Sequence, residues 1–207
     1  MLVVESSVVF RSIVTDILAQ LNGDKGSVVF SENDKPMDIQ KSVDFIFNPF
    51  EPAVNERKLL TQLHNSVKQA ASSELYFERT MQLTADIRSF FWSFEQEFPF
   101  GIEVAGEVDM GALLKAVDFR YEHTSGAMLE NLFQYMSASA CLLHARIFAF
   151  VNLKSCLTEA ELLRLYQEAA YRKWTLFLLE SMDKSSLPSE KKLLIDKDMC
   201  IISDFEV

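Results

Sequence analysis

Four acidic side chains in the middle of the chain have the chemistry to bind a divalent cation. Glu103, Glu107 and Asp109 fall within seven residues around Gly106, and Glu122 follows a short predicted helix that could return it to the same loop. Hard cations such as Ca²⁺ take several carboxylate and carbonyl oxygens, often from a flexible loop. Because the spacing is not that of an EF-hand, the pattern alone favours solvated surface charge over a metal site.

A row of polar side chains offers a second kind of chemistry, which is contact with phosphate. Arg57, Thr61, His64 and Lys68 recur at helical spacing, opposite the apolar face of the same predicted helix. Such a row could meet a DNA backbone without reading bases. An ordinary solvated helix face has the same pattern. The formal net charge of −10 is also unfavourable for nucleic-acid binding unless Lys and Arg gather locally.

The motifs that bind nucleotide phosphates or activate a nucleophile are missing from the sequence. A phosphate loop requires GxxxxGK[ST] directly after the first strand. The nearest candidate is NGDKGS at 22–27, which has its Gly and Lys in the wrong order and follows a helix instead of opening one. Neither GxGxxG nor GxSxG occurs, and the three histidines are far apart. We therefore expect neither ATP hydrolysis nor nucleophilic catalysis.

A strand–helix–strand unit in the second half of the chain indicates the fold class. IFAFVN at 147–152 and WTLFLLE at 174–180 are short apolar runs, and LTEAELLRLYQEAAYRK lies between them. Thr158, with Glu161 three residues later, forms a capping-box pattern at the start of the helix. Such a crossover predicts two parallel strands that are buried on both faces of an α/β sheet.

The remaining pattern divides the chain. Apolar runs predict strands at 2–4, 28–30 and 43–47, and edge strands at 193–195 and 199–202, with a helix that ends at Gly23 after the first strand. Residues 54–98 show only helical periodicity, 100–122 are mixed with a possible strand at 119–122, and 127–144 form another long helix. We expect an α/β domain of residues 1–53 and 146–207, interrupted by a mostly helical insertion at 54–145.

Composition is that of a folded protein of the cytoplasm. The 207 residues suffice for one large domain, or for one domain with an insertion. His144, Arg146 and Asn152 interrupt the longest apolar stretches, so we expect no membrane span. The first residues lack a basic leader, which argues against a signal peptide. The three cysteines have no metal-binding spacing and fit a reducing compartment.

The order of these segments resembles the accessory proteins of type II-A CRISPR systems that take part in acquiring new spacers. The resemblance is clearest in IFAFVN, the following LTEAELLRLYQEAAYRKWTLFLLE and the tail DKDMCIIS. MLVVESSVVFRSIVTDIL matches the family's first strand and helix, and LLKAVDFRYE matches the segment after the carboxylate loop. The family commonly has a further strand pair ahead of the LVVE strand, whereas this sequence begins almost at that strand.

The resemblance implies a degenerate P-loop-ATPase-like sheet domain without the phosphate loop, joined to a mostly helical leg domain. It also implies a homotetrameric ring that binds Ca²⁺ and holds the ends of linear double-stranded DNA without sequence preference. Family members act alongside the CRISPR integrase complex and the RNA-guided effector nuclease, and they are not known as enzymes. A ring would gather modest basic stripes in one channel while the acidic outside stays soluble.

The same resemblance assigns roles to particular residues. The expected calcium ligands are Glu103, Glu107, Asp109 and Glu122, and the expected DNA contacts are Arg57, Lys58, Lys68, Arg79 and Arg88. Two alternatives stay open. One is a diverged nucleotide-binding, ATPase-like enzyme that kept the sheet, and the other is a protein-interaction scaffold that does not touch DNA.

Overall fold

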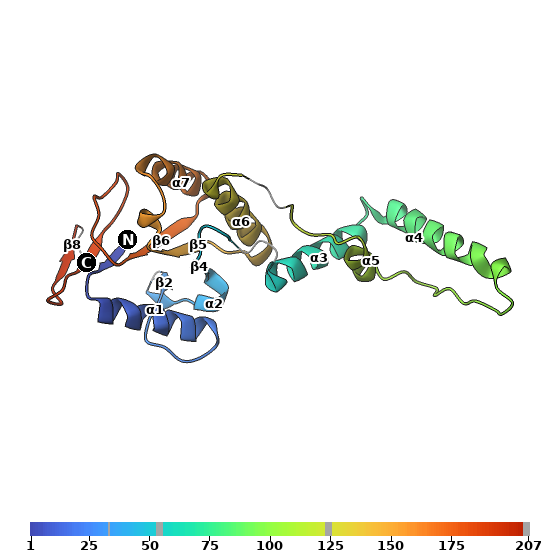
Figure 1. Cartoon of the computed structure of the whole chain (residues 1–207), viewed down its shortest axis with the longest axis horizontal. Helices are drawn as coiled ribbons and strands as arrows, with labels where there is room; N and C mark the ends of the chain where they lie inside the picture. The colour runs from blue at the N-terminus through green and yellow to red at the C-terminus, as the bar shows by residue number, and fades with distance from the viewer. Residues whose placement is uncertain (33, 53–55, 123–125, 205–207) are drawn as a thin grey trace. The chain divides into compact units, whose positions relative to one another are not determined.

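The computed structural model describes residues 1–32, 34–52, 56–122 and 126–204 (Figure 1). The chain divides into two compact units. The sheet unit consists of Met1–Ala53 together with Thr124–Val207, and the helical unit is Val54–His123. None of the described helices is both long and apolar enough to cross a membrane.

The sheet unit contains a six-stranded mixed sheet with the order β4-β5-β6-β1-β7-β8. All neighbouring pairs are parallel except β7 and β8, which are antiparallel. The predicted crossover is confirmed, since β5 and β6 pair in parallel from Ile147 opposite Thr175 onward. The strands are β1 (Leu2–Val4), β4 (Val43–Ile46), β5 (Ile147–Val151), β6 (Thr175–Glu180), β7 (Leu193–Ile195) and β8 (Ile201–Ser203).

Helices cover both faces of this sheet, as an α/β fold requires. Figure 1 shows α1 (Ser7–Leu21) and α2 (Ile39–Ser42) on one face, and α6 (Met128–Leu143) and α7 (Glu159–Arg172) on the other. Val4, Ala149 and Leu179 belong to the core cluster beneath α1. Phe148 and Phe150 alternate with Ala149 along β5 and are fully buried on the opposite face. Burying each such Phe contributes about 1.5–3 kcal/mol.

Helix α7 begins with the capping box that the sequence predicts. The Thr158 side chain accepts a hydrogen bond from the Glu161 backbone N–H at 3.3 Å, and a Glu161 carboxylate oxygen accepts one from the Thr158 N–H at 2.8 Å. The bond from the Thr158 backbone lowers the pKa of the Glu161 carboxyl below its ordinary value. The helix ends at Lys173, which has a left-handed backbone conformation.

The prediction of a strand at 28–30 is wrong. Ser27 and Val28 donate their backbone N–H groups to the Asp16 side chain at 2.8 Å each, so this stretch has hydrogen-bond partners outside a ladder. The apolar residues pack without strand geometry, and the Phe30 ring contacts Phe177 edge-to-face with 5.3 Å between centroids. A two-residue antiparallel pair, β2 (Ser31–Glu32) and β3 (Lys35–Pro36), follows directly.

The helical unit consists of α3 (Arg57–Ala71), α4 (Phe77–Trp92), the 3₁₀ helix η1 (Ser93–Glu97) and α5 (Met110–Ala116). Helix α3 packs against α5. The possible strand at 119–122 is not formed, and the Phe119 carbonyl lies 2.8 Å from His64 Nε2 of α3 instead. Residues of α4 are all at least partly exposed.

Helix α6 belongs to the sheet unit, whereas the predicted insertion of 54–145 includes it. Its Tyr135 hydroxyl donates to the Asp44 carboxylate of β4 at 3.0 Å, and the Ser139 hydroxyl donates to the same carboxylate. Helical periodicity shows that a segment is amphipathic but not which surface it covers. The structural boundary therefore differs from the predicted one at the C-terminal side of the insertion.

Candidate nucleic-acid interface and metal cluster

Three of the expected DNA-binding cations lie on α3. Arg57 and Lys58 form its first two positions, and Lys68 lies three turns further along. All three side chains are exposed, and none has a carboxylate within ion-pair distance among the described residues. Their charges are therefore available to an external anion.

The polar row predicted on α3 is only partly solvated. His64 contacts the Phe119 carbonyl, and its ring lies 6.4 Å from the Phe119 ring, so this histidine holds the segment after α5. The Thr61 hydroxyl donates to the Arg57 backbone carbonyl at 2.6 Å. Lys68 extends across Gly111 of α5, where a Cβ would lie 2.8 Å from its Nζ. The helical spacing of these polar residues does not show which of them make packing contacts and which are free on the surface.

The other two expected DNA contacts lie on α4. Arg79 is exposed, while Arg88 is half-buried and its Nε is a buried nitrogen with no hydrogen-bond partner among the described residues. Arg88 and Trp92 line a hollow of about 480 Å³ on the surface of α4 and η1. An unsatisfied buried donor beside an exposed aromatic ring indicates a surface that needs an additional partner.

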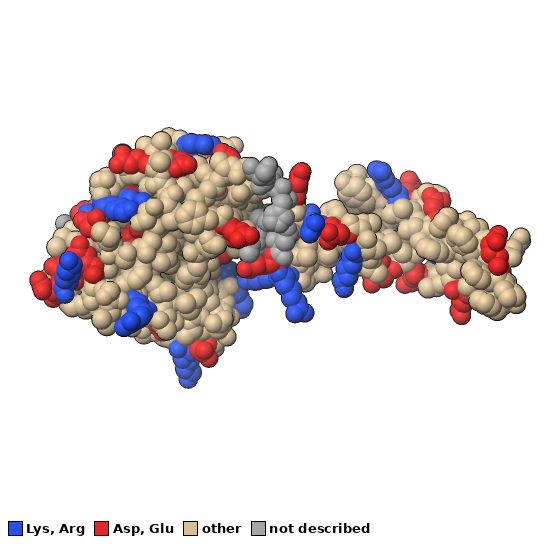
Figure 2. All heavy atoms as spheres, viewed as in Figure 1, with Lys and Arg blue, Asp and Glu red and all other residues tan. Residues whose placement is uncertain are grey.

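Large apolar side chains are exposed in the same segment as these arginines. Figure 2 shows uncharged surface between the charged groups of this segment. Many exposed large apolar side chains in one segment favour an interaction site. The exposed members in α4 and η1 and beside them are Leu75, Tyr76, Phe77, Met81, Leu83, Phe90, Phe91, Trp92, Phe94, Phe98 and Phe100.

The structure does not gather the four expected calcium ligands within one chain. Glu103, Glu107, Asp109 and Glu122 are all exposed, and the described residues contain no group of three His, Cys, Asp or Glu side chains placed to hold a metal. Asp109 has a local role, because its side chain caps α5 by accepting a hydrogen bond from the Gly111 N–H at 2.8 Å. The calcium site therefore stays a prediction.

The first strand leads into its helix without a phosphate-binding loop. Only Glu5 and Ser6 separate β1 from α1, and Ser6 makes no side-chain capping bond. A phosphate-cradling loop needs several backbone N–H groups that converge on the ligand, and two residues do not supply them.

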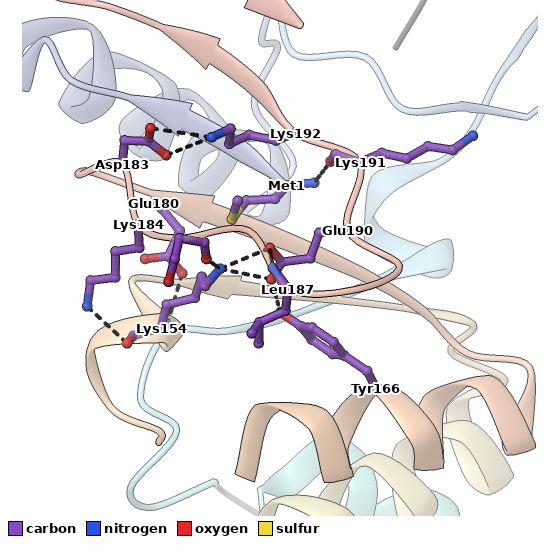
Figure 3. Close-up of polar contacts among 11 residues, drawn as sticks. Met1, Lys154, Tyr166, Glu180, Asp183, Lys184, Leu187, Glu190, Lys191 and Lys192 are labelled. Atoms are coloured by element: carbon purple, nitrogen blue, oxygen red, sulfur yellow. Dashed lines mark hydrogen bonds and ion pairs between the residues drawn. The ribbon is translucent and has the colours of Figure 1, made fainter. Parts of the chain in front are cut away.

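A buried ion pair, which sequence reasoning did not find, lies near the ends of β5 and β6 (Figure 3). Lys154 belongs to the 3₁₀ helix η2 (Leu153–Ser155), and its ammonium donates to both Glu190 carboxylate oxygens at 2.9 Å and to the Ser185 carbonyl at 2.8 Å. The side chains of Lys154 and Glu190 are only 3% and 5% exposed. Tyr166 of α7 also donates to Glu190, and the Lys154 N–H donates to Glu180 at 3.0 Å.

This environment moves the carboxyl pKa values in opposite directions. Burial alone would raise the pKa of Glu190, but hydrogen bonds from Tyr166, the Leu187 N–H and Lys154 together lower it below its ordinary value. Burial raises the pKa of Glu180 and outweighs the hydrogen bond from the Lys154 N–H. For Tyr166, burial and then the Glu190 carboxylate raise the pKa of the phenol.

The network is structural, since the Lys154 charge is neutralised inside the protein and is not offered to a ligand. The sequence carried a weak signal for it. Lys154 lies three residues after the buried strand β5, and Glu180 ends the run WTLFLLE, so both charges lie near where a sheet core ends. The partner Glu190 lies 36 residues from Lys154 in a loop, and no periodicity connects the two.

A match to one protein family includes the helical unit and most of the sheet unit. The model of the CRISPR-associated protein family Cas_Csn2 matches residues 20–199, which is most of the chain. The chain belongs to the Csn2 family. The resemblance to an accessory protein of type II-A CRISPR systems is thereby confirmed, and Csn2 membership supports a role in CRISPR adaptation. A comparison with curated proteins returns no match.

Proposed function

We propose that this Csn2-family chain binds the ends of linear double-stranded DNA without catalysis and thereby supports spacer acquisition. The observation that carries the proposal is the set of cations on α3 and α4 that lack carboxylate partners among the described residues. In a chain with a formal net charge of −10, such unpaired cations can displace counterions from a DNA backbone. The residues are Arg57, Lys58, Lys68, Arg79 and Arg88.

The proposed active form is a homotetrameric ring. The exposed aromatic side chains of α4, with the unsatisfied Arg88 Nε among them, support self-association because aromatic residues and Arg are enriched at protein interfaces. Several copies would also bring separate groups of cations to one DNA duplex, which raises the local positive potential without changing the net charge.

Calcium has a physical role in such an assembly. Exposed carboxylates such as Glu103, Glu107 and Glu122 repel one another when copies meet. A bound divalent cation removes that repulsion and supplies a large local positive charge. We therefore propose that the calcium ligands come from more than one chain, or from one chain whose loop closes on the ion.

The sheet unit serves as a scaffold in this proposal. Its mostly parallel order, with β1 in the interior, and the two-residue connection from β1 to α1 support a degenerate P-loop-ATPase-like fold. The integrase complex and the RNA-guided effector nuclease are the proposed partners of the DNA-bound ring.

The decisive experiment measures binding to linear and closed circular DNA of the same sequence over a series of salt concentrations. We expect binding to the linear form, with affinity that falls steeply as salt rises. Reversing charge in Arg57→Glu with Lys68→Glu should lower the salt slope by about 1 for each lost phosphate contact. Equal binding to both DNA forms would overturn the assignment to ends.

The matched control is Lys197→Glu, which reverses an exposed lysine of the sheet unit that makes no ion pair among the described residues. It should leave both the affinity and the salt slope unchanged. If the α3 variant also binds DNA like the unmodified chain, the scaffold alternative replaces DNA binding through this helix.

A further inference from the structure

A basic hollow lies in the sheet unit, at the edge where two helices end and two strands begin. It has a volume of about 450 Å³ and is lined by His144, Arg146, Arg172, Lys173 and Trp174, with Ala140 and Ala145. The segments 144–146 and 172–174 are far apart in sequence. The register of Ile147 opposite Thr175 and the hydrogen bond from the Thr175 N–H to the Arg146 carbonyl at 2.8 Å bring them side by side.

The positive charge in this hollow is largely uncompensated. Arg146 and Lys173 are exposed and make no ion pair among the described residues. Arg172 pairs with Glu168, which is the single carboxylate that contacts these three cations in the described structure. Two unpaired cations therefore converge on one hollow in a chain whose formal net charge is −10.

Arg172 is held in place rather than free to move. Its guanidinium donates to Ser137 Oγ at 3.0 Å, contacts Glu168, and lies 5.0 Å from the centre of the Trp174 ring. A guanidinium has five N–H donors, so donors remain for a ligand after these contacts. A fixed guanidinium suits phosphate oxygens because little side-chain entropy is lost when it binds them.

Two positions at this edge have a backbone conformation that favours glycine, yet they are a histidine and a lysine. His144 and Lys173 close α6 and α7 in the left-handed conformation, with φ of 58° and 59°. Glycine is the usual residue at such a C-cap because a Cβ is disfavoured there. The helix dipole explains a preference for a cation such as Lys173 near a C-terminus, but it does not explain why that cation occupies the position that favours glycine.

We propose that this hollow binds the terminal phosphate of a DNA strand, an inference that rests on the DNA-binding function proposed above. A terminal phosphomonoester carries about −1.5 to −2 charges near neutral pH, whereas each internal phosphate carries one. Several cations around one hollow therefore favour the terminal group. Trp174 is half-buried and also lines the hollow, so it lies beside the proposed phosphate site.

The test compares a short linear duplex that bears 5′-phosphates with the same duplex bearing 5′-hydroxyls. We expect the full chain to bind the phosphorylated ends roughly tenfold more tightly, as charge-assisted hydrogen bonds to a dianion imply. Arg146→Ala and Lys173→Gly should each reduce this preference, and together they should abolish it. Lys197→Ala, at an exposed lysine elsewhere in the same unit, should leave it intact.

Lys173→Gly also separates binding from folding. Because glycine suits the left-handed C-cap, the variant should unfold at the same temperature as the unmodified chain or at a higher one, while it loses end selectivity. A residue present only to stabilise the helix end would give the opposite result, with a lower unfolding temperature and unchanged selectivity.

A direct probe is inorganic phosphate, followed by tryptophan fluorescence in a Trp92→Phe background, where Trp174 is the remaining tryptophan of the two in the sequence. A saturable change that Arg146→Ala with Lys173→Gly removes supports the site. If the chain binds neither duplex, the DNA function fails. If it binds both ends equally, or keeps its preference in the double variant, this inference alone is overturned.

Discussion

Glu180 and Glu190 belong to one buried network, but different groups donate hydrogen bonds to their carboxylates. Glu190 receives hydrogen bonds from the Lys154 ammonium and the Tyr166 hydroxyl, so its charged form is stabilised. Glu180 is 1% exposed and accepts from the Lys154 N–H, which does not offset the loss of hydration. The two carboxyls should therefore respond differently to the same chemical change.

Removing the charge of Glu190 should destabilise the chain far more than removing that of Glu180. Glu190→Gln removes the carboxylate that the buried Lys154 ammonium contacts and should cost about 3–5 kcal/mol. Glu180→Gln keeps an oxygen that can accept from the Lys154 N–H and should be close to neutral or stabilising at pH 7. Urea unfolding of both variants measures the difference, and similar losses in the two would contradict the assignment.

The pH dependence of the same variants follows from the directions of the two pKa values. The pKa of Glu190 is lowered from 4.5 on folding, so its stabilisation is present above that value and is lost as pH falls through the folded pKa. The pKa of Glu180 is raised from 4.5, so its contribution is largest below that value and is lost as pH rises through the folded pKa. In Glu190→Gln the free energy of unfolding should therefore fall less as pH is lowered below 4.5. In Glu180→Gln it should no longer fall as pH rises toward neutral.

At the scale of single elements, α1 and α7 offer a matched pair of helix starts. Thr158 caps α7 with a side-chain hydrogen bond, whereas Ser6 stands at the N-cap of α1 without one. Thr158→Ala should cost about 1 kcal/mol, the usual value of a capping bond, and Ser6→Ala should cost clearly less. Thermal unfolding of the two variants checks this, and equal costs would mean that the capping box adds nothing to α7.

The elements that could be predicted are those whose signals are local. The capping box and the apolar runs place the β5–α7–β6 crossover, because each is read within a few residues. The strand expected at 28–30 failed because Asp16, on α1, takes the backbone donors of Ser27 and Val28. Such a side-chain contact depends on the tertiary fold, and no periodicity shows it.

The candidate site was predicted unevenly for the same reason. Helical spacing predicts that Arg57 and Lys68 share one face of a helix. Only the structure shows that His64 contacts Phe119 and that the Lys68 side chain lies against Gly111. The calcium site around Glu107 is predicted from acidic residues that lie close together in one loop. In the described chain these side chains do not form a group that could hold a metal.

At the scale of the whole molecule, the surface of α4 supports the proposed self-association. Its residues are all at least partly exposed, and large aromatic side chains such as Phe91, Trp92 and Phe94 face solvent in the isolated chain. Fully burying one such ring contributes about 1.5–3 kcal/mol, so several of them give a strong drive to associate. Association through this surface is what the proposed ring requires of α4.

The native mass in solution tests this association. The unmodified chain with Ca²⁺ should have the mass of a tetramer, whereas Phe91→Glu with Phe94→Glu should shift it toward smaller species, because association would bury two unpaired charges. The matched control is Tyr171→Glu, which changes an aromatic residue of α7 that is 84% exposed and should leave the mass unchanged. A monomer in the unmodified chain with Ca²⁺ would remove the ring.

Chelation of calcium should then act on the same assembly through a different group of residues. If Glu103, Glu107 and Glu122 contribute to ions that bridge copies, removing Ca²⁺ restores their mutual repulsion and should lower both the native mass and the affinity for linear DNA. Glu103→Gln with Glu107→Gln should make the mass less sensitive to the chelator, because it removes the ligands and the repulsion together. Glu159→Gln, in the first turn of α7, is the control and should respond to chelation like the unmodified chain. If chelation changes neither the mass nor the DNA affinity, these carboxylates are solvated surface charge, and the ring must be held by the α4 surface alone.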